Sequence, residues 1–487
     1  MKALKDILKD VVVQDIFGPK SVFVNSIVFD SRKIQTNDLF VAQKGSVFDG
    51  HLFIEKAIEK GASVVVCQEL PAQLSSRTTY VKVEDSDLTL AVLAANFYDN
   101  PSSKLKLVGI TGTNGKTTVA SLLYQLFQKA GYKVGLLSTV KICVNHEHFD
   151  TSHTTPDAVT INSFLSKMVA LGISHCFMEV SSHGIYQKRT EGLFFEGGIF
   201  TNLSYDHLDY HKTFLEYRDV KKKFFDSLSK DAFALVNIDD KNGMLMLQNT
   251  PAKKVSYALK TLADYQSKII EKSFSGMLLQ INKQEVWVRL TGSFNAYNVL
   301  AIYASAVLLG LESDEVLCLI SELESVNGRF EHLISKGGII TIVDYAHTPD
   351  ALKNVLETIQ GVRTGEEKLI TVMGCGGDRD KQKRSKMGYI ASLLSDQVIF
   401  TSDNPRFEEP MDILEQMEEG VLEEYKKRTL SILDRKQAIK TACKFAASRD
   451  IVLLAGKGHE AYQDIKGIKE PFDDKVVIGE ILKELGK

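Results

Sequence analysis

Thr111-Gly112-Thr113-Asn114-Gly115-Lys116-Thr117-Thr118 joins the apolar run 107–110 to a segment in which apolar residues recur at helical spacing up to Gly131. A strand, a glycine-rich turn and a helix in this order are typical of a phosphate-binding loop. Backbone N–H groups surround the anion, Lys116 reaches the outer phosphates, and Thr117 can ligate Mg²⁺. Ile110 stands where the longer motif has glycine, so this is the short G-x-x-G-K-T form. The stretch predicts a nucleoside triphosphate site; a glycine-rich turn that binds nothing is the alternative.

Length and composition favour a multidomain globular protein. The 487 residues suffice for three domains, and 25% of them are charged and 44% hydrophobic. A net charge of −3 gives no electrostatic case for nucleic acid or a membrane surface as a partner. The six cysteines are scattered without a C-x-x-C pair, which argues against disulfides and zinc thiolates. With no signal-peptide core and no apolar run of about eighteen residues, we expect a cytoplasmic protein.

Alternating apolar runs and helix-like stretches predict three α/β domains. In a small N-terminal domain, residues 1–100, strands are expected at 39–42 and 62–67 and a helix at 52–60. The central domain, 101–330, carries the phosphate loop. The C-terminal domain, 331–487, is expected to be Rossmann-like, with strands at 339–343, 369–373, 398–400 and 451–454. A dinucleotide fingerprint starting at Gly374 is an alternative for its second loop, but that pattern would need glycine where Arg379 stands.

Polar residues follow three apolar runs of the central domain. Glu179 follows 176–178, Asn202 follows 198–200 after one residue, and Asn237 follows 233–236. Parallel sheets bind ligands beyond the carboxyl ends of their strands, so these residues are expected near the phosphate loop. Glu179 could there hold Mg²⁺; a surface glutamate after a strand is the alternative.

Two histidines four residues apart, His207 and His211, could suggest a zinc site. The segment lacks the H-E-x-x-H form, and a helical face here would need a further ligand from elsewhere. We therefore favour His207 as a ligand of a hard cation, with satisfied, partly buried histidines as the alternative. The run Lys221-Lys222-Lys223 has the pattern of a solvated charge run, and we adopt that interpretation for Lys222 and Lys223.

Six motifs together resemble those of the Mur ligases, in order and in spacing, over essentially the whole chain. They are Thr111 to Thr118, Glu179 to Gly184, Asp206 to Asp209, Asn295 to Asn298, Gly328 to Glu331 and Asp344 to Asp350. Asp403-Asn404-Pro405-Arg406 resembles the signature of the branch that adds meso-diaminopimelate; lysine-adding relatives differ there.

The resemblance implies an ATP-dependent amide-bond ligase of cytoplasmic peptidoglycan precursor synthesis. ATP would phosphorylate the D-glutamate carboxylate of UDP-N-acetylmuramoyl-L-Ala-D-Glu, and the diaminopimelate amine would displace phosphate from the acyl phosphate. By family match Lys116, Glu179, His207 and Lys221 are catalytic. Mg²⁺ would be held by Thr117, Glu179, His207 and a CO₂-derived carbamate on Lys221. ATP would bind the loop residues Gly112, Thr113, Asn114, Gly115, Lys116, Thr117 and Thr118 together with Asn298, Arg329 and Asp344.

The resemblance also assigns the two remaining substrates. The UDP substrate would contact Phe29, Ser31, Ser46, Val47, Phe48, His153, Thr154, Thr155, Ser181, Gln187 and Arg189. His153 departs from the asparagine of the best-known relatives. Diaminopimelate would contact Arg379, Asp403, Asn404, Pro405, Arg406, Gly456 and Glu460. Diaminopimelate is lysine with a distal carboxylate, and an arginine such as Arg406 pairs with a carboxylate in a bidentate manner.

Three alternative functions remain at this point. A lysine-adding Mur ligase would lack the Asp403 to Arg406 signature, and a folylpolyglutamate synthase would lack the N-terminal domain. A non-catalytic ATP-dependent switch protein is the alternative from another class. The expected partners are small molecules alone, and we expect a monomer.

Overall fold

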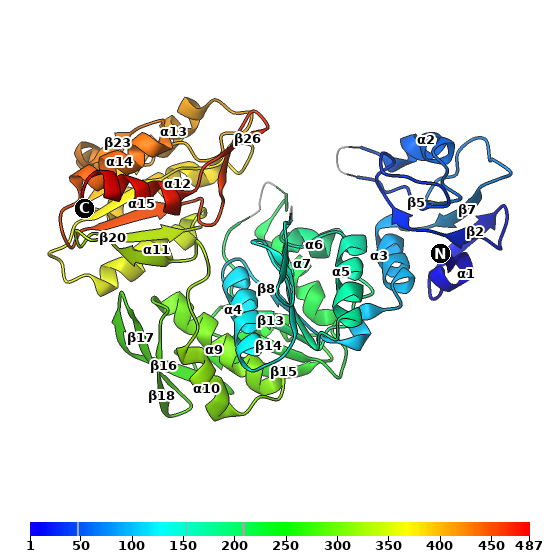
Figure 1. The fold of residues 1–487 in the computed structure, drawn as a ribbon, viewed down its shortest axis with the longest axis horizontal. Helices are drawn as coiled ribbons and strands as arrows, with labels where there is room; N and C mark the ends of the chain where they lie inside the picture. Colours follow the sequence, from blue (N-terminus) through cyan, green and yellow to red (C-terminus); the bar gives the residue numbers. More distant parts are fainter. Residues whose placement is uncertain (46–47, 152, 207–209) are drawn as a thin grey trace.

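Three β-sheets of five, eleven and six strands follow one another along the chain in the computed structural model, which describes residues 1–45, 48–151, 153–206 and 210–487; two further sheets have two strands each. The central part lies between the N-terminal and C-terminal parts, which are far from each other (Figure 1). The fold is therefore mixed α/β with three domains, as the sequence predicts. No helix that these residues form is both long and apolar enough to cross a membrane.

The N-terminal sheet has five strands in the order β2-β7-β6-β5-β4, and all pairs except β2-β7 are parallel. Its inner strand β6 is buried along its whole length, as expected for a strand covered on both faces. The expected strands at 39–42 and 62–67 are confirmed, and the helix starts two residues later than predicted. The elements are β1 (Lys2–Ala3), α1 (Leu4–Ile7), β2 (Val13–Phe17), β3 (Phe23–Val24), β4 (Ile27–Val28), β5 (Leu39–Val41), α2 (Ile54–Glu59), β6 (Val64–Cys67), β7 (Thr79–Val83) and α3 (Ser86–Phe97).

The central sheet has eleven strands, and the phosphate loop follows β8 (Lys106–Thr111) near its middle. Helix α4 (Lys116–Lys129) buries Val119, Leu122 and Phe127 against the sheet, and Gly131, with φ +85°, follows its C-terminal end. The sheet order is β11-β10-β9-β12-β8-β13-β14-β15-β16-β17-β18. The other strands are β9 (Val134–Leu137), β10 (Ile142–Val144), β11 (Glu147–Phe149), β12 (His175–Glu179), β13 (Gly197–Phe200), β14 (Phe233–Asn237), β15 (Lys253–Ala258), β16 (Tyr265–Ser273), β17 (Gly276–Ile281) and β18 (Gln284–Val288). The other helices are α5 (Ala158–Ala170), α6 (Ser182–Tyr186), α7 (Phe214–Asp226), α8 (Gly243–Met246), α9 (Ser293–Leu308) and α10 (Ser313–Ser321).

The C-terminal sheet has the order β19-β20-β24-β21-β22-β23, parallel except for β19. All four strands expected from the sequence are present. The strands are β19 (Glu331–Ile334), β20 (Ile340–Asp344), β21 (Leu369–Met373), β22 (Gln397–Phe400), β23 (Thr429–Ser431) and β24 (Ile451–Ala455), with a hairpin of β25 (Tyr462–Ile465) and β26 (Ile468–Pro471). The helices are α11 (Pro349–Val362), α12 (Gln382–Leu394), α13 (Pro410–Glu418), α14 (Arg435–Phe445) and α15 (Asp474–Glu484).

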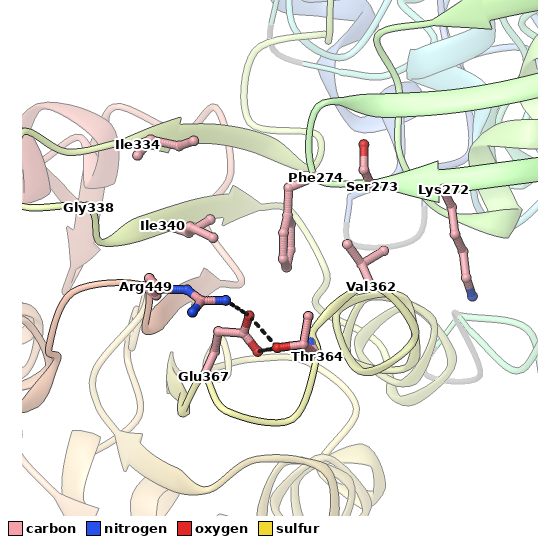
Figure 2. Close-up of a pocket in the computed structure, with 10 residues that line it drawn as sticks. All are labelled: Lys272, Ser273, Phe274, Ile334, Gly338, Ile340, Val362, Thr364, Glu367 and Arg449. Carbon is pink, nitrogen blue, oxygen red and sulfur yellow. Dashed lines mark hydrogen bonds and ion pairs between the residues drawn. The ribbon is translucent and has the colours of Figure 1, made fainter.

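Phe274, at the turn of the β16–β17 hairpin, connects the central and C-terminal domains. Its ring packs against the apolar core of the C-terminal domain and points between Ile340 and Val362 (Figure 2). Thr291 Oγ1 donates a hydrogen bond to the carbonyl oxygen of Ser273 (2.8 Å) and so ties down the base of the turn. Phe274 also lines a small cavity of about 420 Å³ between the two domains.

Candidate active site

A cavity of about 1130 Å³ lies where the carboxyl ends of the central strands face those of the C-terminal strands. The phosphate loop follows β8, and Glu179 ends the neighbouring strand β12. Across the cavity, Asp344 ends β20, and Gly456 follows the adjacent strand β24. Parallel strands bring their carboxyl ends to one edge, so each domain contributes a row of polar loops to the cavity.

Polar residues that follow the neighbouring strand β13 hold the phosphate loop in place. Asn114 N donates to Asn202 Oδ1 (3.0 Å), and Thr201 Oγ1 donates to the Asn114 carbonyl oxygen (2.6 Å). Gly115 has φ +88°, and a Cβ there would come within 2.6 Å of Asn298 Oδ1, so this position requires glycine. Asn237 Nδ2 completes the set by donating to the Thr201 carbonyl oxygen (2.9 Å). The predicted convergence of these polar residues on the loop is confirmed.

Lys116 points back onto its own loop. Its Nζ donates to the carbonyl oxygens of Gly112 (3.0 Å) and Thr113 (2.8 Å). Removal from water lowers the pKa of the Lys116 ammonium, and the Glu179 carboxylate acts against that shift. An anion in the loop would offer this ammonium a stronger partner than two carbonyl oxygens.

The Thr117 hydroxyl and the Glu179 carboxylate form a buried pair of potential metal ligands beside the loop. Thr117 Oγ1 donates to Glu179 Oε2 (3.0 Å), and Glu179 Oε1 accepts from the backbone N–H of Thr139 (2.7 Å). Arg329 Nη2 donates to Thr117 Oγ1 (3.1 Å) from the end of the central domain, just before β19. Hydroxyl and carboxylate oxygens are hard ligands of the kind Mg²⁺ takes, so these residues fit that ion. His207, predicted as a further ligand, lies outside the described residues.

Lys221 is fully buried on α7 behind the phosphate loop. Its Nζ donates to the Gly112 carbonyl oxygen (3.0 Å) and lies 4.8 Å from the centroid of the Tyr217 ring. Burial, and then the nearby Lys116 ammonium, lower the pKa of Lys221 well below its usual value. A lysine held partly as the neutral amine can react with CO₂, so this environment suits a carbamate. The prediction of a solvated side chain is wrong for the neighbouring Lys222, which is buried and pairs with Asp226 (2.7 Å).

The residues assigned to the nucleoside of ATP, which are Asn298, Arg329 and Asp344, line the same cavity as the phosphate loop. Asn298 Nδ2 donates to Asn295 Oδ1 (3.0 Å), and Asp344 Oδ2 accepts from Phe330 N (2.7 Å). The Arg329 guanidinium lies 4.5 Å from the centroid of the Tyr345 ring. Burial raises the pKa of Asp344 to about 6, and the Arg329 charge acts against the rise. A buried carboxylate with free acceptor capacity is suited to ribose hydroxyls.

A second cluster of polar residues, here called the Arg189 group, lies beside Glu179 and consists of Thr155, Ser181, Gln187 and Arg189. Thr155 Oγ1 donates to the Glu179 carbonyl oxygen (2.8 Å) and accepts from Ser181 N (2.9 Å). Arg189 Nη1 donates to the Thr155 carbonyl oxygen (2.6 Å), and Arg189 Nε donates to Gln187 Oε1 (3.0 Å). Further lining residues predicted for the UDP substrate here are His153 and Thr154. The Arg189 charge and these donors suit a carboxylate of a substrate.

Of the residues predicted for uridine, the three that the structure describes, Phe29, Ser31 and Phe48, do not line this cavity. Phe29 is 39% exposed and Phe48 72% exposed on the N-terminal domain, whereas Ser31 is buried. Ser46 and Val47 lie outside the described residues. The sequence-predicted substrate residues thus fall into two groups on different domains.

The C-terminal residues that are predicted to bind the incoming amino acid gather at the far end of the cavity. Asn404 Nδ2 donates to Glu460 Oε2 (2.7 Å), and Asp403, Gly456 and Arg379 line the same wall. Burial, followed by the Asp403 charge, raises the pKa of Glu460.

Arg406 lies at the same end, with φ +52°, and its Nη1 donates to the Gly377 carbonyl oxygen (2.5 Å). Pro405 does not line the cavity; its carbonyl oxygen abuts Gly377, where a Cβ would come within 1.9 Å.

Sequence reasoning did not single out several residues of the site. Tyr345 lies between Arg329 and Glu460, to whose Oε1 its hydroxyl donates (3.3 Å). Asp350, at the start of α11, accepts from Asn114 Nδ2 (3.0 Å). Lys457 lies behind the amino-acid residues. All three stand in motifs used for the family resemblance or in polar loops after strands, which was the available signal.

Comparisons with known proteins cover the chain from end to end. The family models "Mur ligase family, catalytic domain", "Mur ligase middle domain" and "Mur ligase, glutamate ligase domain" match residues 24–98, 110–306 and 328–458. UDP-N-acetylmuramoyl-L-alanyl-D-glutamate--2,6-diaminopimelate ligase of Cytophaga hutchinsonii is 54% identical over 99% of this chain and 100% of its own. The enzyme of the same name from Phocaeicola vulgatus is 54% identical over 98% of this chain and 99% of its own.

A solved structure of a UDP-N-acetylmuramoyl-L-alanyl-D-glutamate--2,6-diaminopimelate ligase has a TM-score of 0.69 and 29% identity, covering 100% of both chains. The family models account for the phosphate loop, the Glu179 strand and the loops that face them. By these full-length similarities, the chain belongs to the Mur ligase family.

Proposed function

We propose that this ATP-dependent ligase adds meso-diaminopimelate to UDP-N-acetylmuramoyl-L-Ala-D-Glu through an acyl phosphate. The observation that carries the proposal is one cavity with three chemically distinct walls: the phosphate loop, the Arg189 group and the Asp403 to Arg406 loop. An enzyme that joins a carboxylate to an amine with ATP needs these three binding functions side by side. Relatives more than 50% identical over their full length bear the name of this reaction.

In the first step a carboxylate oxygen of D-glutamate attacks the γ-phosphorus of ATP, and ADP leaves with the electrons of the broken P–O bond. Arg189, Gln187 and Ser181 orient the carboxylate, while the loop N–H groups hold the phosphates. Lys116 leaves the carbonyl oxygens of Gly112 and Thr113 and pairs with the transferring phosphoryl group. Positioning and charge neutralisation are the main sources of rate in phosphoryl transfer.

Thr117 and Glu179 would hold Mg²⁺ together with His207 and a carbamate on Lys221. The carbamate forms when the neutral Lys221 amine adds to CO₂ and loses one proton, which turns a cation into an oxygen ligand. When bound, Mg²⁺ neutralises negative charge on the phosphate oxygens. The low pKa of the buried Lys221 supports this assignment.

In the second step the diaminopimelate amine attacks the acyl carbon. The carbon–oxygen bond to phosphate breaks, inorganic phosphate leaves, and the nitrogen releases a proton as the amide forms. Asp403, Asn404 and Glu460 bind the charged groups at the distal end, and Arg406 pairs with the distal carboxylate. Lysine would leave Arg406 without an anion, and a polar site left without its partner can discriminate by roughly 10⁴-fold.

The proposal extends to organisation and place of action. We assign residues 1–100 to UDP binding through Phe29, Ser31 and the loop that includes Phe48. Residues 101–330 bind ATP, and residues 331–487 bind the amino acid. The enzyme acts as a monomer in the cytoplasm, on small molecules alone.

Phosphate release with a panel of substrates tests the function directly. ADP and phosphate should appear only with UDP-N-acetylmuramoyl-L-Ala-D-Glu and meso-diaminopimelate together. Equal or faster turnover with L-lysine would contradict the specificity, and turnover with a folate and glutamate would favour folylpolyglutamate synthesis. ATP binding with no turnover on any pair would favour a switch protein.

A further inference from the structure

Lys457 is a fully buried lysine behind the wall of the amino-acid site. It stands in the loop after β24, and its side chain does not line the cavity. Its ammonium Nζ lies 3.2 Å from Asn404 Oδ1, 3.4 Å from Asp403 Oδ1 and 3.6 Å from Glu460 Oε2. One cation therefore contacts three of the residues assigned above to the amino acid.

We propose that Lys457 is a positioning residue that holds Asp403, Asn404 and Glu460 as a charged cradle for the ammonium group at the distal end of the incoming amino acid. This inference rests on the proposed function and adds to it a residue that touches no substrate. Lys457 acts on the amino acid through the three side chains that it orients.

The orientation of Asn404 is set by two donors. Lys457 Nζ and the backbone N–H of Asp464 (2.9 Å) both donate to Asn404 Oδ1. The amide group must then direct its Nδ2 at Glu460 Oε2, to which it donates (2.7 Å). Loss of Lys457 would remove one of the two donors and so weaken the hold of the amide on Glu460.

The charges of the cluster also depend on Lys457. Asp403 and Glu460 face the same space, and the Asp403 charge is, after burial, the main cause that raises the pKa of Glu460. Lys457 acts against that rise; Asn404 and the Tyr345 hydroxyl also donate to Glu460. The buried Arg435 senses both carboxylates but is already paired with Asp474 (2.6 Å). Without Lys457, the pKa of Glu460 would therefore rise further, and a smaller fraction of its carboxyl groups would be ionised at a given pH.

The test compares Lys457→Met with Lys457→Arg and with the control Lys469→Met. Lys469 is exposed, and its ammonium lies over the ring of Tyr462, as does that of Lys457. Lys457→Met should raise the KM for diaminopimelate by roughly tenfold or more at pH 7 and leave the KM for ATP within about twofold. Because raising the pH favours the ionised form of Glu460, the ratio of the Lys457→Met KM to the wild-type KM should fall as the pH rises. Lys457→Arg should recover most of the loss, and Lys469→Met should match the wild type.

A double variant tests the charge argument separately. Glu460→Gln removes one of the two carboxylates, so adding Lys457→Met to it should raise the KM much less than in the wild-type background. The proposal is overturned if Lys457→Met leaves the KM for diaminopimelate unchanged, if the loss is independent of pH, or if the KM for ATP rises equally. It is also overturned if Lys457→Met fails to fold in both backgrounds, because Lys457 would then be a structural residue.

The wild-type assay separates this inference from the proposed function. If the wild type releases no phosphate with the nucleotide dipeptide and diaminopimelate, the proposed function fails, and this inference fails with it. If the wild type turns over and Lys457→Met behaves as the wild type does, only the inference about Lys457 fails.

Discussion

Asn114 of the phosphate loop donates a hydrogen bond from Nδ2 to Oδ2 of Asp350, 3.0 Å away at the N-terminal end of α11. The bond joins the nucleotide loop of the central domain to the domain assigned to the amino acid. Asp350 is partly buried, and burial raises its pKa, whereas Asn114 and Ser204 lower it. The Asp350 carboxylate thus links the C-terminal domain directly to the phosphate loop of the central domain.

Asp350→Ala should lower kcat for amide formation by roughly tenfold. A hydrogen bond to a charged group contributes about 1.5 kcal/mol, and its loss lets the acceptor amine move away from the acyl phosphate. Steady-state phosphate release at saturating substrates measures the change. Asn354→Ala is the matched control, since Asn354 bonds to the same Asp350 oxygen (3.3 Å) from within α11. Equal losses in both variants would show that the contact between domains has no special role.

Lys221→Ala should abolish most activity and leave the fold intact. The variant removes the proposed carbamate ligand, and added short-chain carboxylates should restore part of the rate by supplying oxygen ligands. The control is Lys223→Ala, an exposed position on the same helix. Near-normal turnover of Lys221→Ala in CO₂-depleted buffer without carboxylates would refute the carbamate assignment.

Arg406→Ala should raise the KM for diaminopimelate by roughly 10²-fold, if the bidentate pair contributes about 3 kcal/mol. Discrimination against lysine should shrink, because the variant has no arginine to leave without an anion. The KM for ATP should barely change. The measurement is the ratio of kcat/KM values for diaminopimelate and lysine, in wild type and variant. An identical ratio in the two proteins would mean that Arg406 does not recognise the distal carboxylate.

Asp344→Asn should change how stability depends on pH. Burial raises the pKa of Asp344 from 3.8 to about 6, so the folded state favours the protonated form. The contribution of Asp344 to the free energy of unfolding therefore falls by up to about 3 kcal/mol as the pH rises from about 4 to 6, and it stays low above pH 6. Asp344→Asn has no such titration, so its stability relative to the wild type should increase between pH 4 and pH 6.

Thermal unfolding midpoints of the ligand-free proteins at pH 4, 5, 6 and 7.5 measure this difference. The same variant should bind ATP more weakly, because an amide replaces the carboxylate that accepts from ribose hydroxyls. Midpoint curves of wild type and variant that run parallel across the whole range would contradict the assigned titration.

Much of the fold follows from local patterns in the sequence. Apolar runs such as 64–67 and 451–454 became buried parallel strands, and the spacing after Lys116 became α4. The antiparallel extension β16 to β18 was not predicted, although Ser275-Gly276 and Asn282-Lys283 are turn signals at its two connections. Such strands are stabilised by their partners in the sheet, which single-sequence patterns do not reveal.

The candidate site was predictable in its residue types but not in all of its contacts. Lys116 and Glu179 were identified by their places after apolar runs, and Arg406 by the signature that the Asp403 to Arg406 loop resembles. The burial of Lys457 and its contacts with Asp403 and Glu460 depend on loops from two strands and therefore required coordinates. The position of Phe29, away from the cavity, likewise follows from domain placement and not from any local pattern.

Phe274 has a consequence for attempts to exchange domains between relatives. The ring belongs to the central domain in sequence but packs with the apolar core of the C-terminal domain. A C-terminal domain excised at residue 331 would expose Ile340 and Val362 to water, and the loss of this aromatic partner would promote self-association. A functional chimera must therefore take the β16–β17 hairpin from the same parent as the C-terminal domain, although about 50 residues of chain separate Ile281 at the end of β17 from Glu331 at the start of β19.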